Sequence, residues 1–249
     1  MDQWWAVPED RDVLSSILGI GLVAGTVTTL AGAGGGVFLI LALSLFVGPH
    51  VALAASAPTL LVGNLHRVVL YRREVDRTIA FRVIQGALPA SLVAGALSVS
   101  LPTWFLHGLF GVVTVYAAVR ATGRAKWTPP PGALLPVGAF VGAISAASGG
   151  AGLLLAPMLL ACGLTEKRYV ATGAAIALAT HVGRLAGYGS RGILTREVLL
   201  WSALATVAVV AGNFVGDAVR PHVTGRRATW VENGVLAVCT GLAALGLTH

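Results

Sequence analysis

Residues 32–47 read GAGGGVFLILALSLFV, a cluster of glycines that leads into a short apolar run, and residues 148–161 read SGGAGLLLAPMLLA in the same pattern. Each cluster interrupts an apolar stretch, 13–47 or 133–163, that is too long for one straight transmembrane helix. As a helix, the segment 36–47 would be about 18 Å long, roughly half of the ~30 Å hydrocarbon core. Glycine-interrupted short segments at matched positions of two halves predict a transporter site near the membrane midplane.

The composition around these clusters is that of a membrane protein. Of the 249 residues, 56% are hydrophobic and 11% charged, and the mean hydropathy is +0.82, which excludes soluble enzyme folds. The net charge of +7 comes from bases between apolar runs, where the positive-inside rule places them, so no nucleic-acid partner is expected. We therefore expect a multi-pass protein of a cell inner membrane, with the lipid bilayer as its surroundings.

The cysteines and the N-terminus exclude further features. Cys162 and Cys239 both lie in apolar segments, without the spacing of a disulfide framework or of metal ligands. We expect neither a metal nor a cofactor. The first 12 residues are acidic where a secretory signal is basic, so we expect no cleaved leader.

The chain is an internal duplication. A shift of 117 residues superimposes Gly25 on Gly142, Gly32 on Gly149, Arg67 on Arg184 and Tyr71 on Tyr188. A nine-residue insertion near 217–228 then moves the offset to 126. The predicted organisation is an N-terminal tail (1–12), a first transmembrane repeat (13–120), a linker (121–132) that contains TPPPG, and a second transmembrane repeat (133–249).

The distribution of bases distinguishes two topologies. Four crossings in each half would divide 15 lysines and arginines 10 to 5 between the two faces of the membrane. A re-entrant hairpin and three crossings in each half would divide them 12 to 3, with Arg11, Arg191 and Arg196 on the minor face. The sharper asymmetry favours inverted repeats with both termini outside the cytoplasm. The predicted fold class is all-α, a polytopic bundle in which each repeat has a Gly-broken re-entrant hairpin and about three transmembrane helices.

The acidic residues indicate the charge of the substrate. All ten fall in loops or within about a turn of a segment end. Proton pumps and many cation carriers keep a carboxylate within the hydrocarbon region. The substrate is therefore predicted to be a small anion.

The candidate substrate-binding residues belong to the two glycine runs and to the helices that follow them. Helices that start at glycine runs offer unpaired N–H groups and the positive end of a dipole to an anion. Arg67 and Arg184 would supply charge, and neighbouring residues would supply polar contacts. The predicted set is Gly32, Gly34, Gly35, Gly36, Ser56, Asn64, Arg67, Ser148, Gly149, Gly150, Gly152, Thr172, His181 and Arg184.

Each feature also has a structural explanation. The glycines can serve close helix packing, and an arginine near a helix end can snorkel to the headgroups. A lone membrane histidine is more often a packing residue than a proton carrier. Serine and threonine hydroxyls can bond to their own helix.

The pattern resembles the sulfite exporter TauE/SafE family. GAGGGVFLILAL followed by GPHVALAASAPTLLVGNLHRVVLYRREVDRTIA is similar to the first repeat of that family, and SGGAGLLLAPMLLACGLTEKRYVATGAAIALATHVGRLAGY to the second. The resemblance covers residues 15 to 247 approximately. It implies export of small sulfur-containing anions, such as sulfite or organosulfonates.

The predicted function is therefore a membrane transporter, an exporter of small anions. No catalytic residues are expected, because no nucleophile, acid/base pair or metal cluster is evident within the bundle. An integral membrane enzyme and a non-transporting membrane scaffold are the alternatives. A coupling proton or sodium ion and a homo-oligomer stay open.

Overall fold

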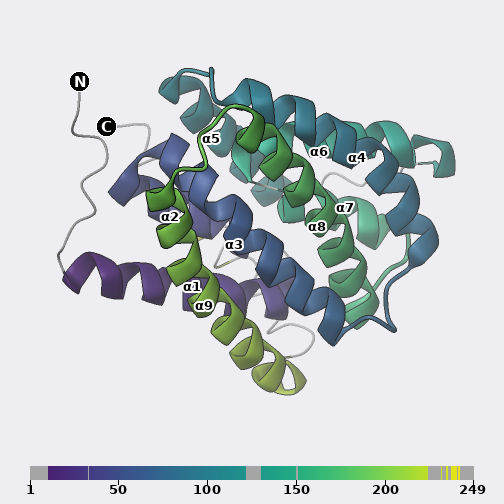
Figure 1. The fold of residues 1–249 in the computed structure, drawn as a ribbon. Coiled ribbons are helices and arrows are strands. Elements are labelled where there is room, and N and C mark those ends of the chain that lie inside the picture. Colours follow the sequence, from purple (N-terminus) through teal and green to yellow (C-terminus); the bar gives the residue numbers. More distant parts are fainter. Residues whose placement is uncertain are drawn as a thin grey trace.

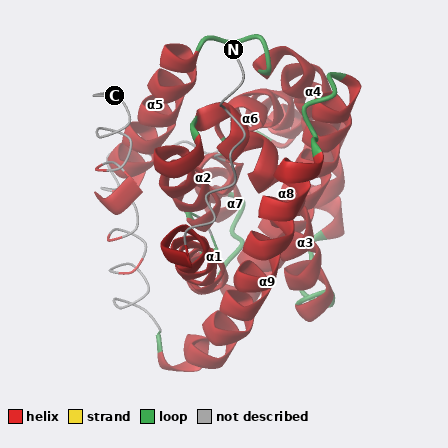
Figure 2. Cartoon of the chain, turned by 60° about the vertical axis from the view of Figure 1, so that its left-hand side comes forward, coloured by secondary structure: helices red, strands yellow, loops and turns green. Residues whose placement is uncertain are grey.

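The computed structural model is all-helical in the residues that it describes, which are 11–32, 34–121, 130–149, 151–223 and the separate positions 231, 234, 237–239 and 241 (Figures 1 and 2). The first half holds α1 (Arg11–Ala31), α2 (Gly35–Val47), α3 (Pro49–Leu70), α4 (Arg77–Ser98) and α5 (Thr103–Ala121). The second half holds α6 (Leu134–Ser148), α7 (Ala151–Ala161), α8 (Glu166–Ser190) and α9 (Arg196–Val219), with short 3-10 turns at Pro131–Ala133 and Arg220–His222. The tail 1–10 and linker residues 122–129 lie outside the described residues.

Four of the described helices are long and apolar enough to cross a membrane: residues 14–31 of α1, then α3, α4 and Arg196–His222, which includes α9. The 25-residue α8 is not in this set, because His181, Arg184 and its charged first turn lower its hydropathy. The helices α2, α6 and α7 are shorter apolar segments.

Both long apolar stretches are broken at their glycine clusters. In the first, α1 ends at Ala31 and α2 begins at Gly35, and the N-cap Gly34 has a φ of 91°. In the second, α6 ends at Ser148 and the C-cap Gly149 has a φ of 66°. Residues that carry a side chain rarely adopt these φ angles, so glycine allows the chain to turn at both points. Ala33 and Gly150, within the two clusters, lie outside the described residues.

The two halves are interlocked. The most extensive helix contacts join α4 to α6 and α1 to α9, so the first helix of each broken pair packs on a helix of the other half. Glycines bring these backbones together: a β-carbon at Gly25 would overlap the Val209 carbonyl, and one at Gly142 would overlap the Ala87 carbonyl. Neither half therefore has a complete core of its own.

Contacts along the helices give their relative directions. Gly138 faces Val83 and Gly142 faces Ala87, so α4 and α6 run in the same direction. By contrast, Arg184 near the end of α8 bonds to Leu53 near the start of α3. Thr172 near the start of α8 bonds to Asp76, which follows α3. The matched helices α3 and α8 therefore run in opposite directions.

The short helix α2 lies inside the bundle. Val37, Leu39, Ile40, Leu41 and Leu43 are all buried. The outward surface carries large apolar side chains instead, such as Phe81, Phe140, Val207 and Phe214. A broken helix at membrane depth must be covered by protein, whereas an apolar outer surface suits lipid. The arrangement is that of a membrane protein.

Candidate functional site

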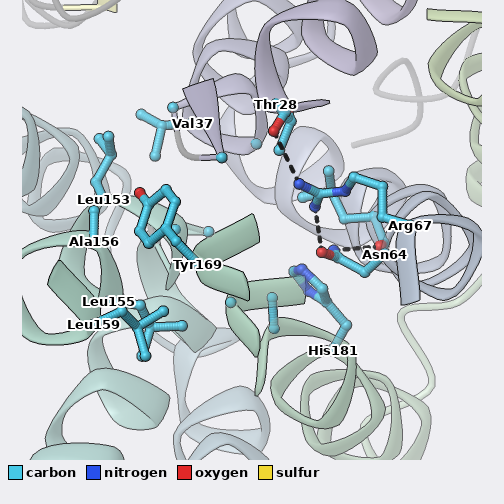
Figure 3. A pocket seen from close by; sticks show the side chains of 18 residues that line it. Thr28, Val37, Asn64, Arg67, Leu153, Leu155, Ala156, Leu159, Tyr169 and His181 are labelled. Atoms are coloured by element: carbon cyan, nitrogen blue, oxygen red, sulfur yellow. Dashed lines mark hydrogen bonds between the residues drawn. The ribbon is translucent and has the colours of Figure 1, made fainter. Parts of the chain in front are cut away.

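A small cavity lies where the end of α1 and the starts of α2 and α7 meet α3 and α8 (Figure 3). Its volume of about 30 Å³ is two to three times the ~10–15 Å³ that one water molecule needs, so the space suits a small ion. Both glycine runs line it, through Gly32, Gly34 and Gly36 of the first and Gly149 and Gly152 of the second.

At some of these positions a neighbouring side chain also fills the space that a β-carbon would need. At Gly32, with a φ of 76°, the Tyr169 ring occupies the place where a β-carbon would lie. A β-carbon at Gly149 would overlap Ile40 of α2. At Gly36 a β-carbon would lie 3.6 Å from the Gly149 carbonyl oxygen, so the two runs meet across the halves.

The charged group of the cavity is Arg67 on α3. Its side chain is only 5% exposed. Nη1 donates to the Thr28 carbonyl oxygen at 3.1 Å, and Nη2 donates to Asn64 Oδ1 (Figure 3). Asn64 in turn donates to the Leu60 carbonyl at 2.6 Å, which orients its amide oxygen toward the guanidinium. Arg67 Nε is buried and has no hydrogen-bond partner in the described chain.

No carboxylate neutralises Arg67 within the described part of the chain. The ion pair found in that part of the chain does not involve Arg67: it joins Arg168 Nη2 to Asp76 Oδ2 at 3.0 Å. Among the described residues that line the cavity, Arg67 is the one with a permanent charge. The cavity is therefore electropositive.

Arg184, at the matched position, is completely buried but does not line the cavity. Its Nη1 lies 3.2 Å from His181 Nδ1. Nη2 donates to the Leu53 carbonyl at 3.2 Å, to Ser56 Oγ at 3.4 Å and to the Tyr188 hydroxyl at 3.3 Å. Burial of both arginines contradicts the snorkelling alternative, in which the guanidinium reaches the headgroups.

The structure brings together only part of the predicted set. Eight of its members line the cavity: Gly32, Gly34, Gly36, Asn64, Arg67, Gly149, Gly152 and His181. Of the others, Gly35 packs on Ala24 and Thr28 of α1, and Thr172 accepts a hydrogen bond from the Asp76 backbone at 2.9 Å. Ser56 contacts Arg184, and Ser148 Oγ donates to the Ile144 carbonyl. Gly150 lies outside the described residues.

Other lining residues were not predicted. Thr28 precedes the first glycine run by one helical turn, and its carbonyl holds Arg67. Tyr169 and an apolar wall of Leu153, Leu155 and Leu159 lie opposite Arg67 (Figure 3). The cavity thus has a polar, positive side and an apolar side.

Comparisons with known proteins identify the family. No curated protein and no solved structure matches the chain. The family model for the sulfite exporter TauE/SafE matches residues 17–244, which is most of the 249 residues and includes every residue of the cavity. The predicted resemblance is thereby confirmed, and the chain belongs to the sulfite exporter TauE/SafE family of membrane transporters.

Proposed function

We propose that the protein carries a small anion across a cell inner membrane and binds it in the cavity beside Arg67. The observation that carries this proposal is a buried guanidinium without a carboxylate partner in the described chain. A charge inside a membrane bundle is costly unless it is paired. A bound anion would supply the missing partner, and Arg67 Nε, which has no partner among the described residues, offers it a donor.

Backbone groups would complete the site. The helix α2 begins at the cavity, and its N-cap Gly34 provides no side-chain bond to the first-turn N–H groups. Gly152, in the first turn of α7, also lines the cavity. Unpaired first-turn N–H groups and the positive ends of two helix dipoles favour negative charge at this point.

The family and the shape of the cavity support a sulfur anion. Members of the family are described as sulfite exporters. The positive side at Arg67 suits a sulfite or sulfonate group, and an organic group would lie toward the apolar wall at Leu155 and Leu159 in a state with a wider cavity. We propose sulfite or a small organosulfonate as the substrate.

The proposed topology is a multi-pass bundle of two inverted repeats, with α1–α2 and α6–α7 as re-entrant hairpins. The opposite directions of α3 and α8, the packing of α1 on α9 and of α6 on α4, and the 12 to 3 division of bases support it. A cytoplasm-negative potential favours outward movement of a monoanion by roughly 2.3 kcal/mol per 100 mV, about a 50-fold ratio. The potential alone can therefore drive export of a monoanion without a coupling ion.

The test is flux in proteoliposomes with radiolabelled sulfite, sulfoacetate and taurine. We expect the native chain to carry at least one sulfur anion and Arg67→Gln to lose most of that flux. Arg191→Gln is the matched control, because Arg191 bonds to Ser100 away from the cavity. Equal flux through the Arg67→Gln and native proteins would refute the site.

A further inference from the structure

A second cavity lies at the opposite side of Arg184 from the candidate site. Its volume is about 570 Å³, and residues that line it include Val47, His50, Ala54, Val99, Ile193 and Val198. These residues belong to the end of α2, the starts of α3 and α9, and the turn after α4 and α8. The basic ends Arg77 of α4 and Arg168 of α8 lie at the other end of these helices. By the positive-inside rule, the second cavity is on the side away from the cytoplasm.

Arg184 separates the two cavities. On one side it contacts His181, which lines the candidate site. On the other side it donates to the Leu53 carbonyl, directly before Ala54 of the second cavity. Tyr188 extends the connection, because its hydroxyl accepts from Arg184 and donates to the Ala146 carbonyl of α6 at 2.7 Å. This bridge ties α8 to α3 and α6.

The matched Arg67 makes a different contact. It donates to the Thr28 carbonyl, which also accepts from Gly32 N at 3.0 Å and so lies at the break of its own half. The matched carbonyl in the second half is that of Ser145, which accepts from Gly149 N at 2.7 Å. No bond joins Arg184 to Ser145; Arg184 bonds across to α3 of the first half instead.

Ser145, to which Arg184 does not bond, and Arg184 itself each have a buried polar group without a partner in the described chain. Ser145 is fully buried, and its hydroxyl has no hydrogen-bond partner among the described residues. Arg184 Nε is also buried, and the described part of the chain offers it no partner. Buried polar groups usually find partners, so these two groups are available for contacts in another state of the protein.

We propose that Arg184 is a latch that closes the route from the candidate site to the second cavity. In the state that opens this route, Arg184 releases Leu53 and Ser56 and moves to the carbonyl and hydroxyl oxygens of Ser145, as Arg67 now donates to the Thr28 carbonyl. In the same step Arg67 leaves Thr28 and takes the matched acceptor on α8, the Val170 carbonyl. The two arginines thus exchange roles between the two states. The inference rests on the proposed transport function.

Thiol labelling tests the latch without any substrate. In a background with Cys162 and Cys239 replaced by serine, Ala54→Cys reports on the second cavity and Ala177→Cys on the candidate site. The purified protein is placed in nanodiscs, so that a polar maleimide reaches both faces. Ala54 is 2% exposed in the latched state, so we expect Ala54→Cys to react slowly while Arg184 is unchanged.

We expect Arg184→Gln to raise the labelling rate at Ala54→Cys about tenfold and to lower it at Ala177→Cys, because a buried charged hydrogen-bond bridge is lost. Tyr188→Phe removes the bonds of the hydroxyl to Arg184 and Ala146 but keeps those of Arg184 to Leu53 and Ser56, so it should give a smaller increase of the same sign. Ser145→Ala, which removes a group without a partner in the latched state, should lower the rate at Ala54→Cys. Arg82→Gln, at an exposed arginine of α4 that lines neither cavity, should change neither rate.

Unchanged labelling in folded Arg184→Gln would overturn the latch. If that variant does not fold, unchanged labelling in both Tyr188→Phe and Ser145→Ala would overturn it equally. Failure of the anion site is a separate result: labelling would shift as expected while Arg67→Gln kept its flux. Normal anion flux with no labelling shift would remove the latch and leave the transport proposal intact.

Discussion

Asn64 and His181 lie 117 residues apart at matched positions, and each contacts the arginine three residues after it. Asn64 Oδ1 accepts from Arg67, and His181 Nδ1 lies 3.2 Å from Arg184 Nη1. Both line the candidate cavity. An imidazole can accept from a guanidinium only through an unprotonated nitrogen, so His181 is neutral and carries its ring proton on Nε2. The two halves therefore hold their arginines with different neutral acceptors.

Substrate affinity should depend on Arg67. Arg67→Gln is expected to weaken binding of the transported anion by ~1–2 kcal/mol, or about 5- to 30-fold in Kd. Arg67→Lys should be milder, because the charge survives although the planar fork is lost. Binding measured by isothermal titration, beside the Arg191→Gln control, checks this. Unchanged affinity in Arg67→Gln would remove the arginine from the site.

Alanine substitutions at two neighbouring glycines should distinguish a role in the anion site from a role in helix packing. A β-carbon at Gly36 would lie 3.3 Å from Leu60, at the cavity, whereas one at Gly35 would overlap the Ala24 carbonyl of α1. We expect Gly36→Ala to lower flux with little change in Tm. Gly35→Ala should lower Tm, because the two helix backbones must separate. The reverse pattern would assign Gly36 to packing.

The topology can be tested by labelling engineered cysteines from each side of the membrane. Arg77→Cys and Arg226→Cys should react from one face, and Arg191→Cys from the other, if the bases divide 12 to 3. Arg226 lies outside the described residues, so this expectation rests on the sequence. Reaction of positions 77 and 226 from opposite faces would contradict the inverted arrangement.

Stability at high pH should depend on Tyr71, at the end of α3. Its hydroxyl donates to Asp217 at 2.5 Å, and Arg220 lies 5.4 Å from the ring centroid. Burial first, and then the bond to Asp217, raises the pKa of Tyr71 above its usual value of 10.0. The unfolded chain ionises first as the pH rises, so the folded state loses stability above about pH 10.

The variant Tyr71→Phe isolates this effect. At pH 7 it should lower the free energy of unfolding by ~1–2 kcal/mol, because Asp217 loses its partner. Between pH 9 and pH 11, roughly the range around the usual tyrosine pKa, it should lose less stability than the native chain. Melting curves across this range measure the difference. Parallel curves would show that Tyr71 does not contribute to the alkaline loss.

The sequence predicted where the helices break and which helices form the cavity better than it predicted the contacts between their side chains. The glycine clusters at 32–36 and 148–152 stand out because few other residues allow the backbone to turn there. The internal repeat then pointed to Arg67, and Asn64 and His181 followed as polar neighbours of the two matched arginines; all three line the cavity. It could not indicate Tyr169, because the matched residue in the first half is Ala52 and the duplication offers no pair.

The internal duplication could not predict that Arg67 and Arg184 have different surroundings. Equal spacing predicts equal roles, yet Arg67 lines the cavity and Arg184 bridges α8 and α3. Their neighbours differ: Ser56 offers Arg184 a hydroxyl, whereas Gly173 at the matched position has no side chain. Such asymmetry arises from tertiary contacts between helices distant in sequence.

The packing of α1 on α9 and of α6 on α4 also bears on how the chain arose. A single copy of the repeat would leave its first helix without the glycine-lined surface that the other copy now provides. We infer that a lone repeat would need a second copy of itself to complete its core. In the present chain both copies belong to one polypeptide, joined by the Pro-rich linker, and can differ at matched positions, as Ser56 and Gly173 do.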